Sequence, residues 1–197
     1  MTAATANQVT ELFALAFHDD PTWSWAFPDR ERRLEQHRVW WGLHVRSALR
    51  HGWVWMTEDG GAASLWIPPG EPELSAKEEA RVVPLLRELL GPHSKDVLTL
   101  LDRFESNHPS GEPHYYLSLL GTHPDHRGRG KGIGLLAANL ARIDELGLPA
   151  YLESSNRGND HRYEQLGFVQ VGEFAAPGGE PTIACMWRDP AGDPEET

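Results

Sequence analysis

The chain has 197 residues, 40% of them apolar and 24% charged, which is typical of one globular domain with a substantial core. Its 18 Lys and Arg against 29 Asp and Glu give a net charge of −11, and this acidic balance argues against a nucleic-acid partner. No apolar run approaches the roughly 20 residues that a membrane helix needs, and no secretory signal is visible. The single cysteine, Cys185, suits a reducing compartment, so we expect a cytoplasmic protein without a membrane partner.

Helices and one hairpin are predicted for the first part of the chain. Apolar residues recur at helical spacing within residues 7–17, and the aromatic-rich stretch after Pro21 is expected to be a loop. Two β-prone runs at 53–57 and 62–67 flank an Asp-Gly-Gly turn and predict a hairpin. Further helices are expected at 29–49, with Asp29 as cap and with Val39 and Trp40 inside, at 75–90 after a Ser75–Glu78 capping box, and at 94–105.

The last part of the chain predicts a sheet with helices. Residues 114–122 form an expected central strand that is apolar on both faces, with Tyr115, Leu117 and Leu119 on one of them. A glycine-rich loop and an amphipathic helix to about residue 146 follow this strand. Further strands are expected at 150–155, 168–173 and 182–187, with a short helix at 159–166. The order of these elements predicts a mixed α/β fold.

The segment at residues 122–134 carries the most specific pattern in the chain. Its glycines let the backbone take positive φ and approach a ligand closely, and the start of a helix adds partial positive charge at the same place. These features predict a cradle for a pyrophosphate. A Walker loop is excluded because Gly132, and not Ser or Thr, follows Lys131. A dinucleotide fingerprint is excluded because Leu135 stands where the third glycine belongs.

A third phosphate-binding pattern, Arg-x-x-Gly-x-Gly, is met by Arg127, Gly130 and Gly132. This loop resembles the coenzyme A loop of the GCN5-related N-acetyltransferases (GNAT). Two flanking stretches occur in the order of that family. Residues 120–124 resemble the end of its fourth strand, and residues 159–168, Asn…Tyr-Glu-x-x-Gly-Phe, resemble its downstream signature.

Within the superfamily the chain looks most like the puromycin N-acetyltransferase group. The similar stretches are residues 16–21, 58–63, 149–155 and 185–190. The family opens with a strand before its first helix, but few residues precede Asn7 here, so we expect that strand to be missing or very short.

The resemblance implies a GNAT fold, with a central mixed and mostly antiparallel sheet flanked by helices. It implies a single domain at residues 1–190, in which 1–112 form the acceptor side and 113–190 the acetyl-CoA-binding core, followed by an acidic tail at 191–197. It also implies direct transfer of an acetyl group from acetyl-CoA to an amine, without a metal. The residues implied to bind the cofactor are Leu120, Gly121, Thr122, Arg127, Gly128, Arg129, Gly130, Lys131, Gly132 and Asn159.

Tyr163 and Glu153 are the candidate catalytic residues. Tyr163 is either the acid that protonates the departing thiolate, since a phenol has a pKa of about 10, or an aromatic packed on a short helix. Glu153 is a charged residue in an apolar strand. It is either the base that deprotonates the incoming ammonium or a strand-end carboxylate paired with an arginine. Asn159 either contacts the cofactor or caps a helix, and His44 and His114 are further base candidates.

Aromatic residues gather in the segment that overlies the acceptor cleft in the family. Trp25 and Trp40 are the candidate substrate-binding residues, and packing in the core is the alternative for both. The leading hypothesis is an N-acetyltransferase that acts on a small-molecule amine, antibiotic-like or aromatic, as a monomer or homodimer. The alternatives are a peptide or protein N-acetyltransferase and a non-catalytic acyl-CoA-binding module.

Overall fold

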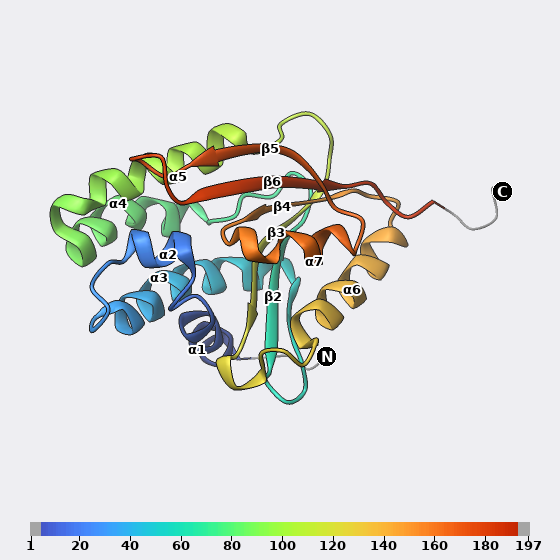
Figure 1. The fold of residues 1–197 in the computed structure, drawn as a ribbon, viewed down its shortest axis with the longest axis horizontal. Coiled ribbons are helices and arrows are strands. Elements are labelled where there is room, and N and C mark those ends of the chain that lie inside the picture. Colours follow the sequence, from blue (N-terminus) through green and yellow to red (C-terminus); the bar gives the residue numbers. More distant parts are fainter. Residues whose placement is uncertain (1–4, 193–197) are drawn as a thin grey trace.

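The computed structural model describes residues 5–192, in which one mixed sheet forms the centre of the molecule (Figure 1). The sheet has six strands in the order β1-β2-β3-β4-β6-β5. Only β3 and β4 run parallel, and every other neighbouring pair is antiparallel. The strands are β1 (Val54–Met56), β2 (Ala62–Ile67), β3 (Tyr115–Thr122), β4 (Ala150–Ser154), β5 (Val169–Ala175) and β6 (Thr182–Arg188). The mixed, mostly antiparallel sheet that the sequence predicts is therefore confirmed.

Helices cover both faces of this sheet. One cluster of buried side chains joins the first five helices to one face of β1, β2 and β3, and a second joins α6 to the other face (Figure 1). The helices are α1 (Ala6–Ala16), α2 (Pro21–Ala26), α3 (Arg33–Ala48), α4 (Ala76–Leu90), α5 (Ser94–Asn107), α6 (Lys131–Asp144) and α7 (Asp160–Glu164). None of the helices in the described part of the chain combines the length and apolarity that a membrane crossing requires.

Three predictions for the N-terminal helices are wrong. The stretch after Pro21 is a short helix and not a loop, because the Asp20 side chain accepts hydrogen bonds from the first turn and Pro21 suits the first helical position. The next helix begins at Arg33, since the Asp29 side chain accepts hydrogen bonds from the N–H groups of residues 31 and 32 and caps a preceding turn. The prediction that Val39 lies inside is a third that is wrong, because Val39 is exposed on that helix.

The two ends of the chain concern the predictions of a missing first strand and of an acidic tail. Among the described residues no strand precedes α1, so β1 is the edge of the sheet on that side, and residues 1–4 lie outside the described part. Most of the expected acidic tail, residues 193–197, lies outside it as well. The Ala191 N–H donates to the carboxylate of Asp144 on α6.

A β-bulge in β3 reverses the alternation of its side chains. Leu65 of β2 pairs with Leu119, whereas Trp66 pairs with Leu117, so Ser118 is the additional residue. Leu117 therefore packs on the α6 side of the sheet and Leu119 on the α1 side. The prediction that both share one face with Tyr115 is wrong, because strict alternation fails at a bulge.

Candidate active site

A cavity of about 1200 Å³ lies where the two parallel strands separate. β3 and β4 pair at only three positions, which end with Leu117 opposite Leu152, and β3 then continues to Thr122. The backbone of residues 118–122 thus has no β4 partner on that side. Residues 118–120 line the cavity directly after the point of separation. An extended ligand in this gap finds backbone N–H and C=O groups with which to hydrogen-bond.

The glycine-rich loop follows β3 and leads into α6. Gly128 and Gly130 have φ of 75° and 71°, a conformation that favours glycine, and Gly130 is the N-cap of α6. A Cβ at Gly132 would lie 2.5 Å from Oγ1 of Thr122, so glycine permits the close approach of helix and strand. The first N–H groups of a helix have no intrahelical partners, and Gly134 is the first residue of α6 whose N–H bonds back, to Gly130. The loop lies beyond the end of β3 and does not line the cavity.

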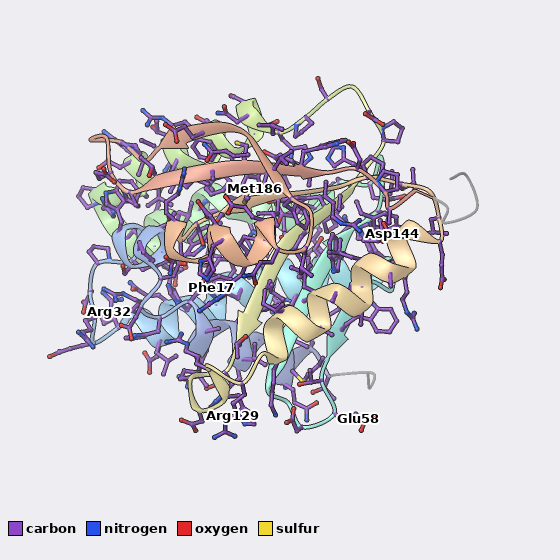
Figure 2. All side chains as sticks on the ribbon, turned by 45° about the vertical axis from the view of Figure 1, so that its right-hand side comes forward. Phe17, Arg32, Glu58, Arg129, Asp144 and Met186 are labelled. Atoms are coloured by element: carbon purple, nitrogen blue, oxygen red, sulfur yellow. The ribbon has the colours of Figure 1, made fainter. Side chains whose placement is uncertain are left out.

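The three cations of this loop have different surroundings. Arg127 donates from Nη2 to the carbonyl of Ala16 at 2.9 Å, at the end of α1. Lys131 forms an ion pair with Asp59 of the β1–β2 turn. Arg129 is exposed and lies at the same end of the molecule as Glu58 of that turn (Figure 2). Arg127 and Arg129 are thus both exposed to solvent without an ion pair within the described chain, whereas Lys131 is paired.

Tyr163, on α7, lines the cavity. Its ring packs against Phe168 with the ring centroids 6.2 Å apart. Burial raises the pKa of the Tyr163 hydroxyl well above its usual value, and the charges of Asp20 and Asp160 raise it further. The phenol is therefore protonated at neutral pH, which is the form that donates a proton.

Asn159 also lines the cavity and stands at the N-cap position of α7, but its side chain makes no capping hydrogen bond. Its Oδ1 accepts a hydrogen bond from Nη1 of Arg162 at 2.7 Å. The side chain that stabilises the turn before α7 is Asn156, which accepts from the N–H of Gly158 at 3.0 Å. Asn159 thus holds the N-cap position without capping through its side chain, and a contact with the cofactor stays a prediction.

Asp20 lines the cavity, although it is not among the site residues that the sequence predicts. Its carboxylate accepts from the N–H groups of Thr22 and Trp23, at 3.0 and 3.2 Å, and from Oγ of Ser155 at 2.9 Å. Burial raises the pKa of Asp20 to about 6, although these three hydrogen bonds act in the opposite direction. The available signal was an Asp-Pro pair, which is typical of a helix N-terminus.

Glu153 is a second buried carboxylate in the cavity wall. Its side chain is 2% exposed, and neither of its oxygens has a hydrogen-bond partner within residues 5–192. The basic side chain within ion-pair distance is His108, whose Nδ1 lies 3.5 Å from Oε1. The alternative of a pair with arginine is wrong, because no Arg of the described chain lies within ion-pair distance of this carboxylate.

Of the two candidate tryptophans, only Trp40 lines the cavity. It is 1% exposed and stands beside Trp41 and Trp23, with ring centroids 6.3 and 6.5 Å away. Trp25 lines a separate and shallower cavity and packs against His93, so its assignment to the acceptor site is corrected. His44 lines the main cavity and its Nδ1 lies 3.2 Å from the carbonyl of Trp40.

The cavity is acidic and aromatic. Among the described residues that line it there is neither Lys nor Arg. Its acidic side chains are those of Asp20, Glu71, Glu73, Glu79, Glu105, Glu112 and Glu153. Its aromatic side chains are those of Phe17, Trp23, Trp40, Trp41, Phe104, Tyr116 and Tyr163. No group of three or more His, Cys, Asp or Glu in residues 5–192 is arranged to hold a metal ion.

The sequence profile of the acetyltransferase (GNAT) family matches residues 12–168, and the protein belongs to this family. A mycothiol acetyltransferase of Propionibacterium freudenreichii subsp. shermanii is 39% identical over 64 residues. That match covers 31% of this chain and 20% of the relative, so the chain spans only about a fifth of the relative's length.

Solved structures share the fold over nearly the whole chain. An acetyltransferase of Corynebacterium glutamicum, described as histone acetyltransferase HPA2 and related acetyltransferase, has a TM-score of 0.70 at 22% identity, over 98% of this chain and 97% of its own. Arylalkylamine N-acetyltransferase 2 of Aedes aegypti has a TM-score of 0.65 at 13% identity, over 97% and 98%. Such identities show the fold alone. The finer resemblance to the puromycin N-acetyltransferase group is not supported, because the similar proteins are varied acetyltransferases.

Proposed function

We propose that this protein transfers an acetyl group from acetyl-CoA to the amine of a small cationic molecule with an apolar or aromatic body. The observation that carries the proposal is the composition of the cavity, which is rich in carboxylates and aromatic rings and has no Lys or Arg among its described lining residues. A cleft with charge of one sign concentrates ligands of the opposite sign. Aromatic faces hold apolar groups and attract cations.

The loop and the start of α6 fit the diphosphate of the acyl carrier. The left-handed Gly128 and Gly130, where an added Cβ would meet nothing within 4 Å, leave the backbone open to a ligand, and a helix N-terminus attracts anions. The unpaired edge of residues 118–122 leads from this loop to the cavity and fits the extended arm of the carrier. In this arrangement residues 113–190 would bind acetyl-CoA, which supplies the activated acetyl group, and residues 1–112 would provide most of the acceptor side.

Three groups of the chain have distinct roles in the proposed transfer. A backbone N–H of the bulged segment at residues 118–120 polarises the thioester carbonyl, which is an electrostatic effect of the kind that dominates acyl transfer. Tyr163 donates its hydroxyl proton to the departing sulfur. Glu153, which no hydrogen bond within residues 5–192 satisfies, accepts a proton from the acceptor ammonium. An amine is a nucleophile only after that proton has left.

The test is release of free thiol from acetyl-CoA with a panel of amines. Phenethylamine and phenylalanine form a matched pair that differs by one carboxylate, and puromycin joins the panel because of the resemblance in sequence. We expect kcat/KM for phenethylamine to exceed that for phenylalanine at least about tenfold, since like charges across a site cost roughly 1–3 kcal/mol or more.

Each other outcome of this panel contradicts part of the proposal. Turnover of peptides alone would remove the small-molecule acceptor. Binding of acetyl-CoA in calorimetry without turnover of any amine would favour a non-catalytic binding module. A preference for acidic amines would contradict the role of the carboxylates.

A further inference from the structure

A chain of polar side chains leads from Glu153 to the surface. Nδ1 of His108, the C-cap residue of α5, lies 3.5 Å from Oε1 of Glu153. Nε2 of His108 lies 3.2 Å from Nε2 of His114, and Nδ1 of His114 lies 2.7 Å from the carbonyl oxygen of Glu112. The side chain of Glu153 is 2% exposed and that of His108 is 34% exposed, so the chain joins a buried carboxylate to an accessible ring.

The hydrogen bonds fix where the protons of this chain lie. A carbonyl oxygen only accepts, so Nδ1 of His114 carries a proton. In a neutral His114 the other nitrogen is then bare, and His108 donates to it from Nε2. The Nδ1 of a neutral His108 is consequently bare and faces a carboxylate oxygen. In this His108–Glu153 pair, a proton that reaches the carboxylate can therefore pass to the bare Nδ1 of His108.

The groups around the pair keep this arrangement. Burial lowers the pKa of His114, and the neighbouring His108 lowers it further, so His114 stays neutral. The rings of Tyr116 and Tyr151 lie 4.7 and 5.1 Å from that of His108. Burial raises the pKa of both phenols, and the charge of Glu153 contributes in the same direction, so both stay protonated.

Three further groups complete the surroundings. The charge of Glu73 acts on Tyr116, and Cys185 lies next to Tyr151, where burial raises the pKa of its thiol. The carbonyl of Glu112 holds His114 from the other side. Among these facing groups, the His108–Glu153 pair joins a buried carboxylate to a partly exposed ring.

We propose that Glu153 accepts a proton from the acceptor ammonium and passes it to His108, and that His108 then releases a proton to solvent. His114 is a positioning residue that holds His108 in the required tautomer. This inference rests on the proposed function and names the proton route of that site. The transfer forms one C–N bond and breaks one C–S bond, and the ammonium loses two protons. One proton leaves through Glu153 and His108. The other replaces the proton that Tyr163 gives to the thiolate, so one proton in total reaches solvent.

The kinetic test compares His108→Gln with wild type on the best amine of the panel between pH 7 and 9.5. We expect kcat to fall roughly 100-fold at pH 7, with the amine KM little changed, which is the usual contribution of an acid–base group. The loss should shrink to less than about tenfold at pH 9.5, because an alkylamine with a pKa of about 10 is then partly neutral without help. Added imidazole should restore part of the rate at pH 7.

Two variants serve as comparison. His93→Gln removes a histidine at the other end of α5, which also bonds to a backbone carbonyl, and should leave the rate and its pH profile unchanged. His114→Phe keeps a ring against Trp187 but removes the acceptor for His108, and should lower kcat roughly tenfold. A loss in His108→Gln that is equal at all pH values would indicate structural damage and overturn the relay.

A second readout does not depend on turnover. Nitrogen-15 NMR of the histidine rings in the unliganded protein should show His114 protonated at Nδ1 and bare at Nε2, and His108 protonated at Nε2. The opposite tautomer of His114 would overturn the proposal. A wild type that acetylates amines while His108→Gln keeps its full rate would remove the relay but not the proposed function. A wild type that acetylates no amine would remove both.

Discussion

Asp20 and Glu153 are both buried carboxylates in the wall of one cavity, and their surroundings differ. Asp20 accepts three hydrogen bonds, from the first turn of α2 and from Ser155. Glu153 accepts none within residues 5–192, and its neighbours are the ring of His108 and the phenols of Tyr116 and Tyr151. A buried charge without partners is costly and persists where function requires it. Asp20 therefore joins two parts of the cavity wall, whereas Glu153 is available to an incoming cation.

The largest effect is expected from Glu153→Gln. This change keeps the size of the side chain but removes the charge and the proton acceptor, so kcat/KM at pH 7 should fall roughly 1000-fold. Thermal stability should stay within about 1 kcal/mol of wild type or rise, because an unpartnered buried charge is lost. Steady-state kinetics and thermal melts check both statements. Retention of the wild-type rate would show that Glu153 is not the base that deprotonates the acceptor ammonium.

Asp20→Asn should alter stability more than chemistry. The pKa of Asp20 in the folded protein is about 6, against 3.8 for the free side chain. Protonation is thus favoured by folding, so this contribution is fully present below about pH 4 and is lost as the pH rises through 6, which amounts to about 3 kcal/mol.

The measurement for Asp20 is denaturant unfolding of wild type and Asp20→Asn between pH 4 and 7. Wild type should lose stability across this window relative to the variant, whose amide does not titrate. Parallel curves for the two proteins would contradict the assignment of this buried carboxylate.

Tyr163→Phe tests the phenol that faces the cavity beside Asp20. Removal of the hydroxyl should lower kcat roughly 100-fold, whereas the affinity for acetyl-CoA should change less than about twofold, because the ring and its packing on Phe168 remain. Kinetics and calorimetry give the two numbers. An unaltered kcat would identify Tyr163 as a packing residue and leave the donor unassigned.

The smallest effect is expected at the start of α6, where two glycines form a matched pair. Gly132→Ala should weaken acetyl-CoA binding about tenfold and cost roughly 1–3 kcal/mol of stability, because its Cβ would lie 2.5 Å from Thr122. Gly134→Ala has nothing within 4 Å of the new Cβ and should stabilise by about 0.5–1 kcal/mol. Equal behaviour of the two variants in calorimetry and melting would argue against a close fit at Gly132.

The sequence predicted the parts of the fold that local patterns determine. The hairpin, the capping Ser75 and the loop at residues 127–132 depend on neighbours in the chain, and their positions agree with the structure. The bulge at Ser118 depends on the register between β2 and β3, which no local pattern reveals. Asp20 was missed as a cavity residue because its place in the wall depends on contact with Ser155, far along the chain.

The acceptor side was the harder part for the same reason. Trp25 and Trp40 are equal candidates in sequence, and only the packing of α2 and α3 places Trp40 in the wall of the main cavity and Trp25 outside it. The His108–Glu153 pair joins the end of α5 to β4, so it too depends on tertiary structure. Chemistry that one loop carries is visible in a sequence, whereas chemistry that several segments assemble is not.

The most direct test is a crystal structure of the protein with coenzyme A and the preferred amine. We predict that the diphosphate accepts hydrogen bonds from backbone N–H groups within residues 128–133, that the sulfur lies near the hydroxyl of Tyr163, and that the amine nitrogen lies within reach of Glu153. A diphosphate bound away from this loop, or an amine bound outside the cavity, would contradict the account.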